Sequence, residues 1–377
     1  MRIGIDISSV AGEKTGVGNY TANLIENLAK IDKTNQYLLY PSFYRSFYRE
    51  FTKTAVPRQS NFHIRFEKMP QRLMHLLWYS PIPKEWLLGD IDLLHSTAFY
   101  APEYHPGKLV VTIHDISPFT LPQYHTNANR KRSIRGTENA VAHADHILTV
   151  SDFSKNELLK YFNVEPEKIT VTHLAAKDIF APCSPEEQKK VREKYGVPAN
   201  FVLFVGSLEP RKNITTLVRA YISLPEMIRV QHPLVIVGGK GWLNTDIGAL
   251  ITLNFSSGVR CIGYADEQDL PALYSAASVF VLPSWYEGFG LPVLEAMACG
   301  TPVISSNSSS LPEVGGDAAL YFDPYDSRQL GDCLENLLGD ENQRAQLSRK
   351  GTERARQFSW EKTARKTLVV YERVYNE

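Results

Sequence analysis

The residues with the clearest chemical potential are two glutamates that stand eight positions apart. Glu287 follows the apolar residues 279–284, which have the pattern of a buried strand, and Glu295 lies in residues 292–300, which have helical preferences. Glu287 should therefore lie in a loop at a strand's carboxyl end, and Glu295 on the next helix. Open α/β sheets bind ligands at that edge, where helix amino termini offer free N–H groups. Carboxylates accept hydrogen bonds from sugar hydroxyls, and two of them indicate a nucleotide sugar.

The segment between the two glutamates is suited to backbone contacts with a ligand. Gly288 and Gly290 flank Phe289 and lack a Cβ, so the chain can approach a bound group closely. Leu291 then opens the helical stretch. We expect these four residues to offer backbone amides to the ligand.

A basic pair precedes another helical stretch. Arg211 and Lys212 follow the strand and turn FVGSLEP and lead into residues 213–221. When a nucleoside diphosphate leaves its sugar, negative charge develops on an oxygen that fixed cations and helix amides can stabilise without a metal. Arg offers a planar fork and Lys a point charge, so the pair can hold two phosphoryl groups. From spacing alone, a solvated basic pair beside a turn is an equal alternative.

Three glycines follow the first predicted strand. Gly12, Gly16 and Gly18 precede a helical stretch that starts near Asn19, an arrangement that can cradle a phosphate. The pattern lacks the third glycine of a dinucleotide fingerprint and has no G-K-[ST]. An ordinary strand-to-helix turn is the alternative.

His114 and Asp115 end the predicted strand KLVVTIH and should face the ligand from the amino-terminal half. A histidine there can hydrogen-bond the donor sugar or position an acceptor hydroxyl. Taken alone, a histidine at a strand end is more often packed or capping. Asp115 either caps the next turn or touches the acceptor. Ser151 and Asp152 precede the helical FSKNELLKY, which favours a helix N-cap role.

A metal site is not expected. Asp90 and Asp92 form a D-x-D, but Asp92 leads directly into the apolar LLH, so the pair fits the polar entrance of a buried strand. No ligand spacing is found among His63, His75, His105, His125 and His173. The lack of any C-x-x-C pair speaks against a metal or disulfide framework and favours a reducing compartment for Cys183, Cys261, Cys299 and Cys333.

Composition bounds the number of domains and the partners. A chain of 377 residues exceeds what one core usually organises, so two domains are expected. Lys plus Arg and Asp plus Glu each number 41, so no global field draws the protein to nucleic acid. Met1 leads directly into the strand-like RIGIDI, and no apolar run approaches the ~20 residues that span a bilayer. We expect a cytoplasmic protein without a signal peptide.

Strand-like runs alternate with amphipathic stretches in both halves of the chain. This alternation predicts an α/β fold with parallel sheets and helices on both faces. The pattern breaks near Pro182 and Pro185, where we place the interdomain connection. The expected parts are an amino-terminal domain over residues 1–172, a connection over residues 173–195, a carboxyl-terminal domain over residues 196–357 and a final helix over residues 358–377.

The spacing of Glu287 and Glu295 matches the E-x7-E motif of the retaining family-four glycosyltransferases, which the chain resembles from about Arg2 to Tyr375. Further segments resemble that family in order and spacing, namely GTGVGNY, FVGSLEPRKN, GTPVISS and LPEVGGDAALYFDP. The resemblance implies a GT-B fold, in which two Rossmann-like domains face each other across a cleft and the final helix crosses back. It also implies transfer of a hexosyl group from a nucleotide sugar to a hydroxyl, with retained anomeric configuration.

In the carboxyl-terminal half, the resemblance gives each candidate residue a role. Glu287 contacts the donor sugar and supports its oxocarbenium-like charge, and Glu295 accepts hydrogen bonds from the ribose. Arg211 and Lys212 bind the diphosphate. Tyr264, which follows the predicted strand VRCIG, is a candidate neighbour of the base.

In the amino-terminal half, the resemblance brings Gly16, Val17 and Gly18 close to the distal phosphate and the sugar. It also favours a functional role for His114. No carboxylate is clearly placed as a nucleophile, so we expect a same-face mechanism in which the leaving phosphate takes the acceptor proton. Neither a metal nor a cofactor is expected.

The segments VTIHDISPF, THLAAKDIF and GSLEPRKN are most similar to the mannosyltransferase-B-like branch, which builds bacterial O-antigen and related polysaccharides. GDP-mannose is therefore the expected donor, while UDP-glucose, UDP-N-acetylglucosamine or a deoxysugar donor stays open. An epimerase of this fold lacks an acceptor, and a pyridoxal-phosphate phosphorylase needs a Schiff-base lysine that cannot be placed. The intact set of candidate residues argues against a non-catalytic sugar-nucleotide-binding subunit.

The acceptor expected from the resemblance is a glycan or polyprenyl-linked glycan at the inner membrane leaflet. Aromatic side chains and cations alternate in residues 43–51, aromatic side chains recur in residues 69–88, and a separate basic cluster follows at residues 130–135. Each cation near an anionic surface contributes on the order of 1 kcal/mol. An aromatic core and a solvated helix face are the equal alternative. The aromatic candidates for membrane contact are Trp78, Tyr79 and Trp86, and the basic candidates are Arg130, Lys131, Arg132 and Arg135.

Overall fold

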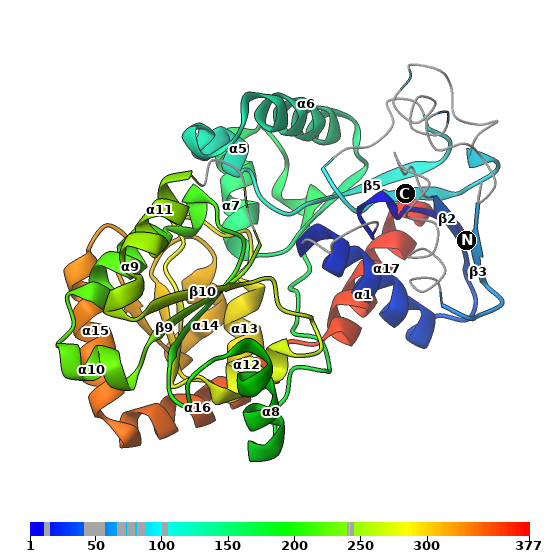
Figure 1. Ribbon diagram of the computed structural model, residues 1–377. Helices are drawn as coiled ribbons and strands as arrows, with labels where there is room; N and C mark the ends of the chain where they lie inside the picture. The colour runs from blue at the N-terminus through cyan, green and yellow to red at the C-terminus, as the bar shows by residue number, and fades with distance from the viewer. Residues whose placement is uncertain are drawn as a thin grey trace. The chain divides into compact units, whose positions relative to one another are not determined.

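The computed structural model describes most of the chain as two compact units (Figure 1). The described residues are 1–10, 16–40, 57–65, 73, 80, 88–99, 105–239, 241 and 245–377. The first unit comprises Met1–Pro122, Asn127–Leu174 and Ser359–Glu377, and the second comprises Gln123–Thr126 and Ala175–Phe358.

Within the described residues, the first unit contains a seven-stranded parallel sheet with the order β3-β2-β1-β4-β5-β6-β7. Its strands are β1 (Arg2–Asp6), β2 (Gln36–Tyr40), β3 (Phe62–Ile64), β4 (Leu93–Ser96), β5 (Lys108–Ile113), β6 (His146–Thr149) and β7 (Ile169–Val171). The strand order reverses between β1 and β4, because β2 and β3 follow on one side of this pair and β5 to β7 on the other. Ligands of open α/β sheets bind outside the carboxyl ends of strands at such a point.

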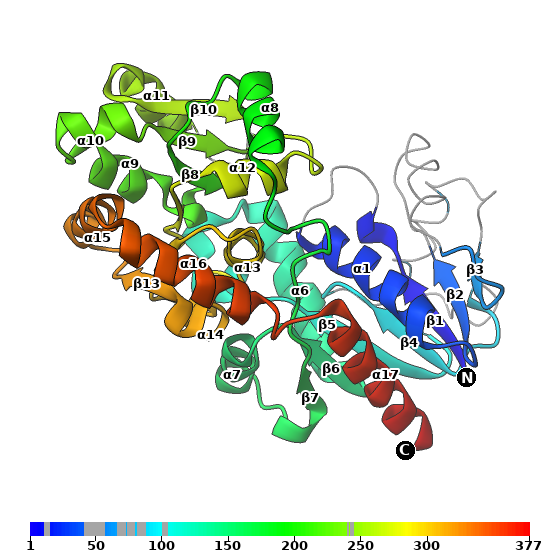
Figure 2. The ribbon, with the colours of Figure 1, turned by 90° about the horizontal axis from the view of Figure 1, so that it is seen from below.

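Helices cover both faces of this sheet. They are α1 (Gly16–Ile31), α5 (Ser117–Thr120), α6 (Asn127–His143), α7 (Asp152–Tyr161) and α17 (Trp360–Asn376). Helices α1 and α17, from opposite ends of the chain, pack side by side on one face (Figure 2). The other face packs against α6 and α7 through an apolar core.

The two faces of the sheet differ in polarity because side chains alternate along a strand. Val111 of β5 joins the apolar core, whereas its neighbour Thr112 lies on the face of α1 and α17. Thr112 Oγ1 lies 2.9 Å from the hydroxyl of Tyr20 and 2.8 Å from Nε2 of His95. His95 Nδ1 in turn lies 2.6 Å from the hydroxyl of Tyr371 in α17. A buried chain of hydrogen bonds therefore ties the last helix to the first sheet.

Helix α17 is amphipathic, which explains why it docks. Ser359 caps it by accepting a hydrogen bond from the Lys362 N–H at 3.2 Å. Its buried residues recur at helical spacing and form one stripe: Trp360, Thr363, Ala364, Thr367, Val370, Tyr371 and Val374.

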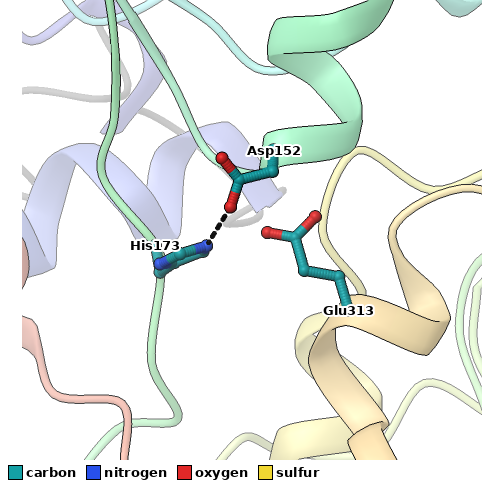
Figure 3. A group of neighbouring side chains, drawn as sticks. All are labelled: Asp152, His173 and Glu313. Atoms are coloured by element: carbon teal, nitrogen blue, oxygen red, sulfur yellow. Dashed lines mark ion pairs between the residues drawn. The ribbon is translucent and has the colours of Figure 1, made fainter.

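Helix α7 begins with the cap predicted from the sequence. Ser151 Oγ accepts a hydrogen bond from the Ser154 N–H at 3.0 Å, which confirms the N-cap role. In the first turn, Asp152 Oδ2 lies 3.7 Å from Nε2 of His173, as Figure 3 shows. This contact adds an ion pair when His173 is protonated.

The described residues of the second unit form a six-stranded parallel sheet with the order β10-β9-β8-β11-β12-β13. Its strands are β8 (Val202–Val205), β9 (Leu234–Val237), β10 (Val259–Gly263), β11 (Val279–Leu282), β12 (Val303–Ser306) and β13 (Ala319–Phe322). Here the strand order reverses between β8 and β11. Both units thus have the Rossmann-like arrangement, and the predicted α/β fold is confirmed.

Helices also flank the second sheet. They are α8 (Pro185–Tyr195), α9 (Ile214–Ile222), α10 (Glu226–Gln231), α11 (Thr245–Leu253), α12 (Leu270–Ala276), α13 (Leu291–Ala298), α14 (Leu311–Gly315), α15 (Ser327–Gly339) and α16 (Glu341–Ala355). Helix α9 packs with α11 and α15, whereas α13 packs with α12, α14 and α16. Among the helices in the described parts of the chain, none is both long and apolar enough to cross a bilayer.

Residues 173–195, the expected interdomain connection, contain a well-formed helix. Ser184 and Glu187 build a reciprocal capping box at the start of α8, and Gly196 ends the helix with a φ of 62°. The units divide between Leu174 and Ala175, and α8 belongs to the second unit.

Candidate functional site

The charged candidates of the second unit converge because their strands are neighbours. Arg211 and Lys212 lie in the short η5 turn (Pro210–Lys212) after β8, and Glu287 lies in the loop between β11 and α13. Strands β8 and β11 are paired at the point where the strand order reverses. Residues 75 positions apart in sequence are thereby brought into contact.

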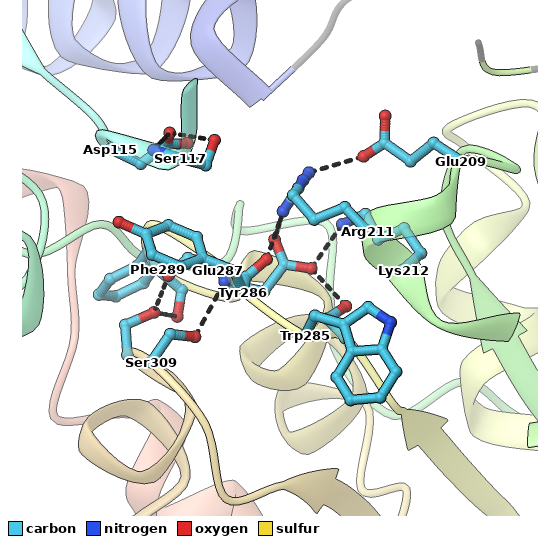
Figure 4. Close-up of polar contacts among 12 residues, drawn as sticks. Asp115, Ser117, Glu209, Arg211, Lys212, Trp285, Tyr286, Glu287, Phe289 and Ser309 are labelled. Atoms are coloured by element: carbon cyan, nitrogen blue, oxygen red, sulfur yellow. Dashed lines mark hydrogen bonds and ion pairs between the residues drawn. The ribbon is translucent and has the colours of Figure 1, made fainter. Parts of the chain in front are cut away.

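Glu287 binds both cations, as Figure 4 shows. Lys212 Nζ lies 2.7 Å from Glu287 Oε1, and Arg211 Nη1 lies 3.0 Å from Oε2. The hydroxyl of Ser284 donates a third hydrogen bond to Oε1 at 2.6 Å. Glu287 is 6% exposed, so these contacts replace water around the carboxylate.

The electrostatics of Glu287 favour its ionised form. Burial opposes the charge, but the attraction of Lys212 and Arg211, with hydrogen bonds from Lys212 and Ser284, outweighs burial and lowers the pKa of Glu287 to about 2. Glu287 is therefore a carboxylate at neutral pH. A carboxylate of such low basicity that is bound by three donors is a poor nucleophile.

Arg211 also binds a second carboxylate. Its Nη2 lies 2.7 Å from Glu209 Oε1, and its Nη1 donates to the carbonyl of Tyr286 at 2.5 Å. Glu209 is only 1% exposed, and its Oε2 has no hydrogen-bond partner among the described residues. Burial raises the pKa of Glu209 in spite of the attraction of Arg211 and Lys212.

Serines hold the loop that carries Glu287. Ser309 Oγ accepts a hydrogen bond from the Glu287 N–H at 2.9 Å. Ser310 Oγ lies 2.8 Å from the carbonyls of both Glu287 and Phe289. Gly290 then starts α13 with a φ of 107°, which only glycine adopts easily. A Cβ at this position would also lie 2.6 Å from the Leu311 side chain.

Around the loop, the structure gives the remaining amide candidates different surroundings. Phe289 is buried and packs edge-on against Phe358, whereas Gly288 and Leu291 are partly exposed. Pro292 lies in the first turn of α13 and Gly300 follows its end with a φ of 78°, as the sequence predicts.

Glu295 has a separate environment. The hydroxyl of Tyr274 in α12 donates to Glu295 Oε2 at 3.0 Å. Burial raises the pKa of Glu295 to about 7, against the hydrogen bond from Tyr274 and the attraction of Lys177. The two glutamates of the motif therefore differ by charge state: one is ionised, and the other is poised near neutrality.

Tyr264 follows β10, at the edge of the sheet, and its side chain is 61% exposed. Its role beside the base stays a prediction.

In the first unit, the predicted glycine segment opens α1. A Cβ on Gly18 would lie 2.5 Å from the carbonyl oxygen of Ser9, so packing alone requires glycine there. Gly16 has open space where its Cβ would be, and Val17 between them is partly exposed. Gly12 lies outside the described residues.

His114 follows β5 in the first unit. Its Nε2 lies 2.9 Å from the carbonyl of Thr97, so Nε2 carries the proton, and its ring meets Tyr20 edge-on at 4.8 Å. Burial lowers the pKa of His114, so the ring is neutral and Nδ1 can accept a hydrogen bond. The next residue, Asp115, has a structural role. It accepts hydrogen bonds from the N–H and hydroxyl of Ser117.

Asp90 and Asp92 lie where the sequence predicts, at the entrance of β4. Asp90 Oδ2 pairs with the Arg2 guanidinium at 3.1 Å, and Asp92 Oδ2 accepts the Arg2 N–H at 2.7 Å. Both carboxylates thus fasten the edge of β1 to β4.

Several residues of the charged cluster escape sequence reasoning. Glu209 sits in the quoted segment FVGSLEPRKN, and an acid two positions before an arginine is the signal that could have indicated it. Ser284, Ser309, Ser310 and Tyr274 carry no pattern that separates them from ordinary polar residues.

Comparison with known proteins agrees with this geometry. Residues 186–354 match the model of the family "Glycosyl transferases group 1", and residues 14–176 match that of "Glycosyltransferase Family 4". O-antigen chain mannosyltransferase B from Escherichia coli is 36% identical over 365 residues, which cover 95% of this chain and 96% of that protein. The serotype-specific mannosyltransferase WbdA from Escherichia coli is 30% identical over 71% of this chain and 34% of its own length.

Solved structures share the fold. Sucrose-phosphate synthase from Thermosynechococcus elongatus superposes with a TM-score of 0.76 and 22% identity over 100% of this chain and 99% of its own. WaaG, a glycosyltransferase involved in lipopolysaccharide biosynthesis, gives a TM-score of 0.75 at 16% identity over 97% of this chain and 98% of its own. The coverage of both halves and the identity to the O-antigen enzyme show that this chain belongs to the group-1, family-four glycosyltransferases of the GT-B fold.

Proposed function

We propose that this glycosyltransferase transfers mannose from GDP-mannose to a hydroxyl of a glycan or lipid-linked glycan, with retained anomeric configuration, in polysaccharide biosynthesis. The similarity to O-antigen chain mannosyltransferase B supports the sugar and the pathway class. The observation that carries the site is the pairing of Arg211 and Lys212 with Glu287 at the junction of β8 and β11.

In this proposal, the donor's diphosphate replaces the Glu287 carboxylate as the partner of Arg211 and Lys212. Arg211 and Lys212 already hold an anionic oxygen pair in a place that is mostly shielded from water. The donor's diphosphate takes over these contacts, and Glu287 turns to the hydroxyls of the sugar. The amides at the start of α13 add positive potential, because a helix amino terminus attracts anions.

Glu295 binds the ribose in this proposal. A hydroxyl of the nucleoside donates to its carboxylate and thereby offsets the effect of burial that raises its pKa to about 7. Tyr274 holds the other side of the carboxyl group at 3.0 Å. Glu295 is therefore fully ionised only when the nucleoside is bound.

The transfer step needs no protein nucleophile. The bond between the anomeric carbon and the phosphate oxygen breaks while the acceptor oxygen bonds the same face of that carbon. The acceptor proton moves to the departing phosphate oxygen, whose charge Arg211 and Lys212 stabilise. The low pKa of Glu287 supports this mechanism over a covalent glycosyl-enzyme. In the first unit, neutral His114 offers Nδ1 to a hydroxyl of the donor sugar or acceptor.

A donor panel tests the proposal. The protein is incubated with GDP-mannose, UDP-glucose or UDP-N-acetylglucosamine and a glycan acceptor, and the products are identified by mass spectrometry and by the anomeric NMR signal. We expect a mannose-sized mass increase with GDP-mannose and an α-linkage from the α-donor. Structures of Anabaena HepE contain UDP-glucose, so the fold itself does not select guanine. Transfer from a UDP-sugar alone, or nucleotide binding without transfer, would contradict the proposal.

Independence from metal is part of the proposal, because Arg211 and Lys212 supply two cations that can hold the diphosphate. Activity is expected to survive excess chelator. This assignment would be overturned if activity required Mg²⁺ or Mn²⁺ and the Asp92→Ala variant lost that metal-dependent activity.

The proposed acceptor is lipid-linked, which would bring the first unit to a membrane surface. Helix α6 presents a cluster of exposed cations that suits anionic headgroups, namely Arg130, Lys131, Arg132 and Arg135. Residues 43–51 and the aromatic residues Trp78, Tyr79 and Trp86 lie outside the described residues. Co-sedimentation with anionic and neutral vesicles at low and high salt tests this part. Equal, negligible sedimentation of the wild type and the Arg130/Lys131/Arg132 triple-alanine variant would favour a soluble acceptor.

A further inference from the structure

Glu209 is a buried carboxylate that the proposed reaction does not use. It lies on the opposite side of the Arg211 guanidinium from Glu287, so that Arg211 bridges two carboxylates (Figure 4). Glu209 is less exposed than Glu287, Arg211 or Lys212, and one of its oxygens has no partner among the described residues. A buried charge that is only half satisfied contributes little to stability, which suggests a role in function.

The charges of the cluster balance without a ligand. Two cations, Arg211 and Lys212, face two carboxylates, Glu209 and Glu287. A diphosphate can bind the cations only if a carboxylate gives way. Glu287 has an alternative partner in the donor sugar, whereas Glu209 is buried behind Arg211.

We propose that Glu209 is the permanent counter-ion of Arg211: it keeps the guanidinium in position when Glu287 turns to the donor, and its charge limits how tightly the site holds the departing nucleoside diphosphate. This inference rests on the proposed function, because it assumes that Arg211 binds phosphate. Glu209 is thus a positioning residue that acts through Arg211.

The two parts of the proposal predict opposite effects for two substitutions. Glu209→Gln keeps a hydrogen-bond acceptor for Arg211 but removes one negative charge, so GDP should bind roughly tenfold more tightly. Glu209→Asp keeps the charge but is too short to reach Arg211 in the same way, so GDP should bind more weakly than to the wild type. A purely structural role for Glu209 would make both variants bind GDP more weakly.

The pH dependence sharpens the test. Burial places the pKa of Glu209 above its usual range, while Arg211 and Lys212 lower it and Glu287 raises it. Below that pKa, wild-type Glu209 is protonated and resembles glutamine. As pH rises through it, the wild type gains a negative charge and loses affinity relative to Glu209→Gln. The diphosphate's own titration near pH ~6 affects both proteins alike and cancels in their ratio.

The experiment measures the dissociation constant of GDP by calorimetry for the full chain, from about pH 5 to about pH 8. The ratio of the wild-type value to the Glu209→Gln value is expected to increase with pH and to reach roughly ten at the upper end of this range. Glu226→Gln, an exposed change at the start of α10, is the matched control and should give a ratio near one throughout.

Two failures are distinguishable. If wild-type protein binds GDP no better than guanosine, the phosphate assignment of the proposed function fails. If GDP binds well but the ratio stays at or below one at every pH, only the role of Glu209 is overturned. Should Glu209→Gln not fold, Glu209→Asp tests the positioning role alone, and GDP affinity equal to that of the wild type would overturn that role.

Discussion

Asp6 and Glu287 are similarly buried carboxylates near strand ends of two parallel sheets with similar strand order, and their acidities shift in opposite directions. Asp6 ends β1 and is 7% exposed, while Glu287 follows β11 and is 6% exposed. Burial raises the pKa of Asp6 to about 6, because its hydrogen bonds from Ser8 compensate only in part. Burial has the same sign at Glu287, but two bonded cations reverse the outcome and lower its pKa to about 2.

The contrast extends to the polar contacts inside each unit. In the second unit, charged side chains meet at the paired ends of β8 and β11. In the first unit, a neutral network of three hydroxyls and His95 connects β4 and β5 to α1 and α17, and burial lowers the pKa of His95 to about 3. The same fold therefore supports two electrostatic environments, and the residues at strand ends decide which one forms.

The largest expected effect comes from removing a cation. Arg211→Ala and Lys212→Ala should each reduce turnover by ~10²-fold or more, because they remove stabilisation of the charge that develops on the leaving diphosphate. Guanosine binding should change little, since guanosine has no phosphate. Steady-state kinetics and calorimetry provide the measurements, and Lys189→Ala on the exposed surface of α8 is the control. Near-normal turnover in both variants would show that the charged cluster does not bind phosphate.

Next in size is a pair of stability changes with opposite sign. Glu287 contributes stability above pH ~4.5 that is lost as pH falls toward its folded pKa of about 2. Asp6 contributes stability below the ordinary aspartate pKa of 3.8 that is lost as pH rises through about 6. At 1.36 kcal/mol per pKa unit, each effect is about 3 kcal/mol.

Melting temperatures across pH test this pair. Relative to the wild type, Asp6→Asn should gain stability as pH rises from about 4 to about 7, and Glu287→Gln should gain stability as pH falls from about 5 to about 2. If both variants shift in the same direction with pH, the electrostatic contrast between the two carboxylates is wrong.

A smaller effect is expected at Glu295. Its folded pKa of about 7 means that the carboxylate forms as pH rises through neutrality, and only the carboxylate offers a charge-assisted hydrogen bond to ribose. The affinity for guanosine should therefore increase by roughly tenfold between pH ~6 and ~8. Calorimetry with Glu295→Gln should give a flat profile, and exposed Glu335→Gln should behave as the wild type. A wild-type affinity that falls with pH would place the ribose elsewhere.

The smallest effect on activity, near zero, is expected in the neutral network. Tyr371→Phe leaves His95 Nδ1 without its 2.6 Å partner and should cost about 1–2 kcal/mol locally. Amide hydrogen exchange in Trp360–Asn376 should accelerate roughly tenfold, while turnover stays close to that of the wild type. Tyr375→Phe on the same helix is the control, because Tyr375 is 48% exposed. Unchanged exchange would show that the network does not hold α17.

The sequence by itself determined which strands and helices carry the site residues, and most of the boundaries of these elements. Periodicity predicts the strands before Arg211 and Glu287, and Pro292 with Gly300 bounds the helix between them, because these signals are local. The motif Glu287–Glu295 and its neighbours indicate the family, which the comparisons confirm. The assignments of individual site residues stay predictions.

Only the tertiary structure decided which charges meet and which stay ionised. No local pattern tells that Glu287 would bind Arg211 and Lys212, because the pairing of β8 with β11 creates that contact. Glu209 likewise becomes conspicuous only through its burial behind Arg211. The acidity of a carboxyl group depends on burial and on cations distant in sequence, so residue type and spacing cannot show that Glu287 titrates near 2 and Glu295 near 7.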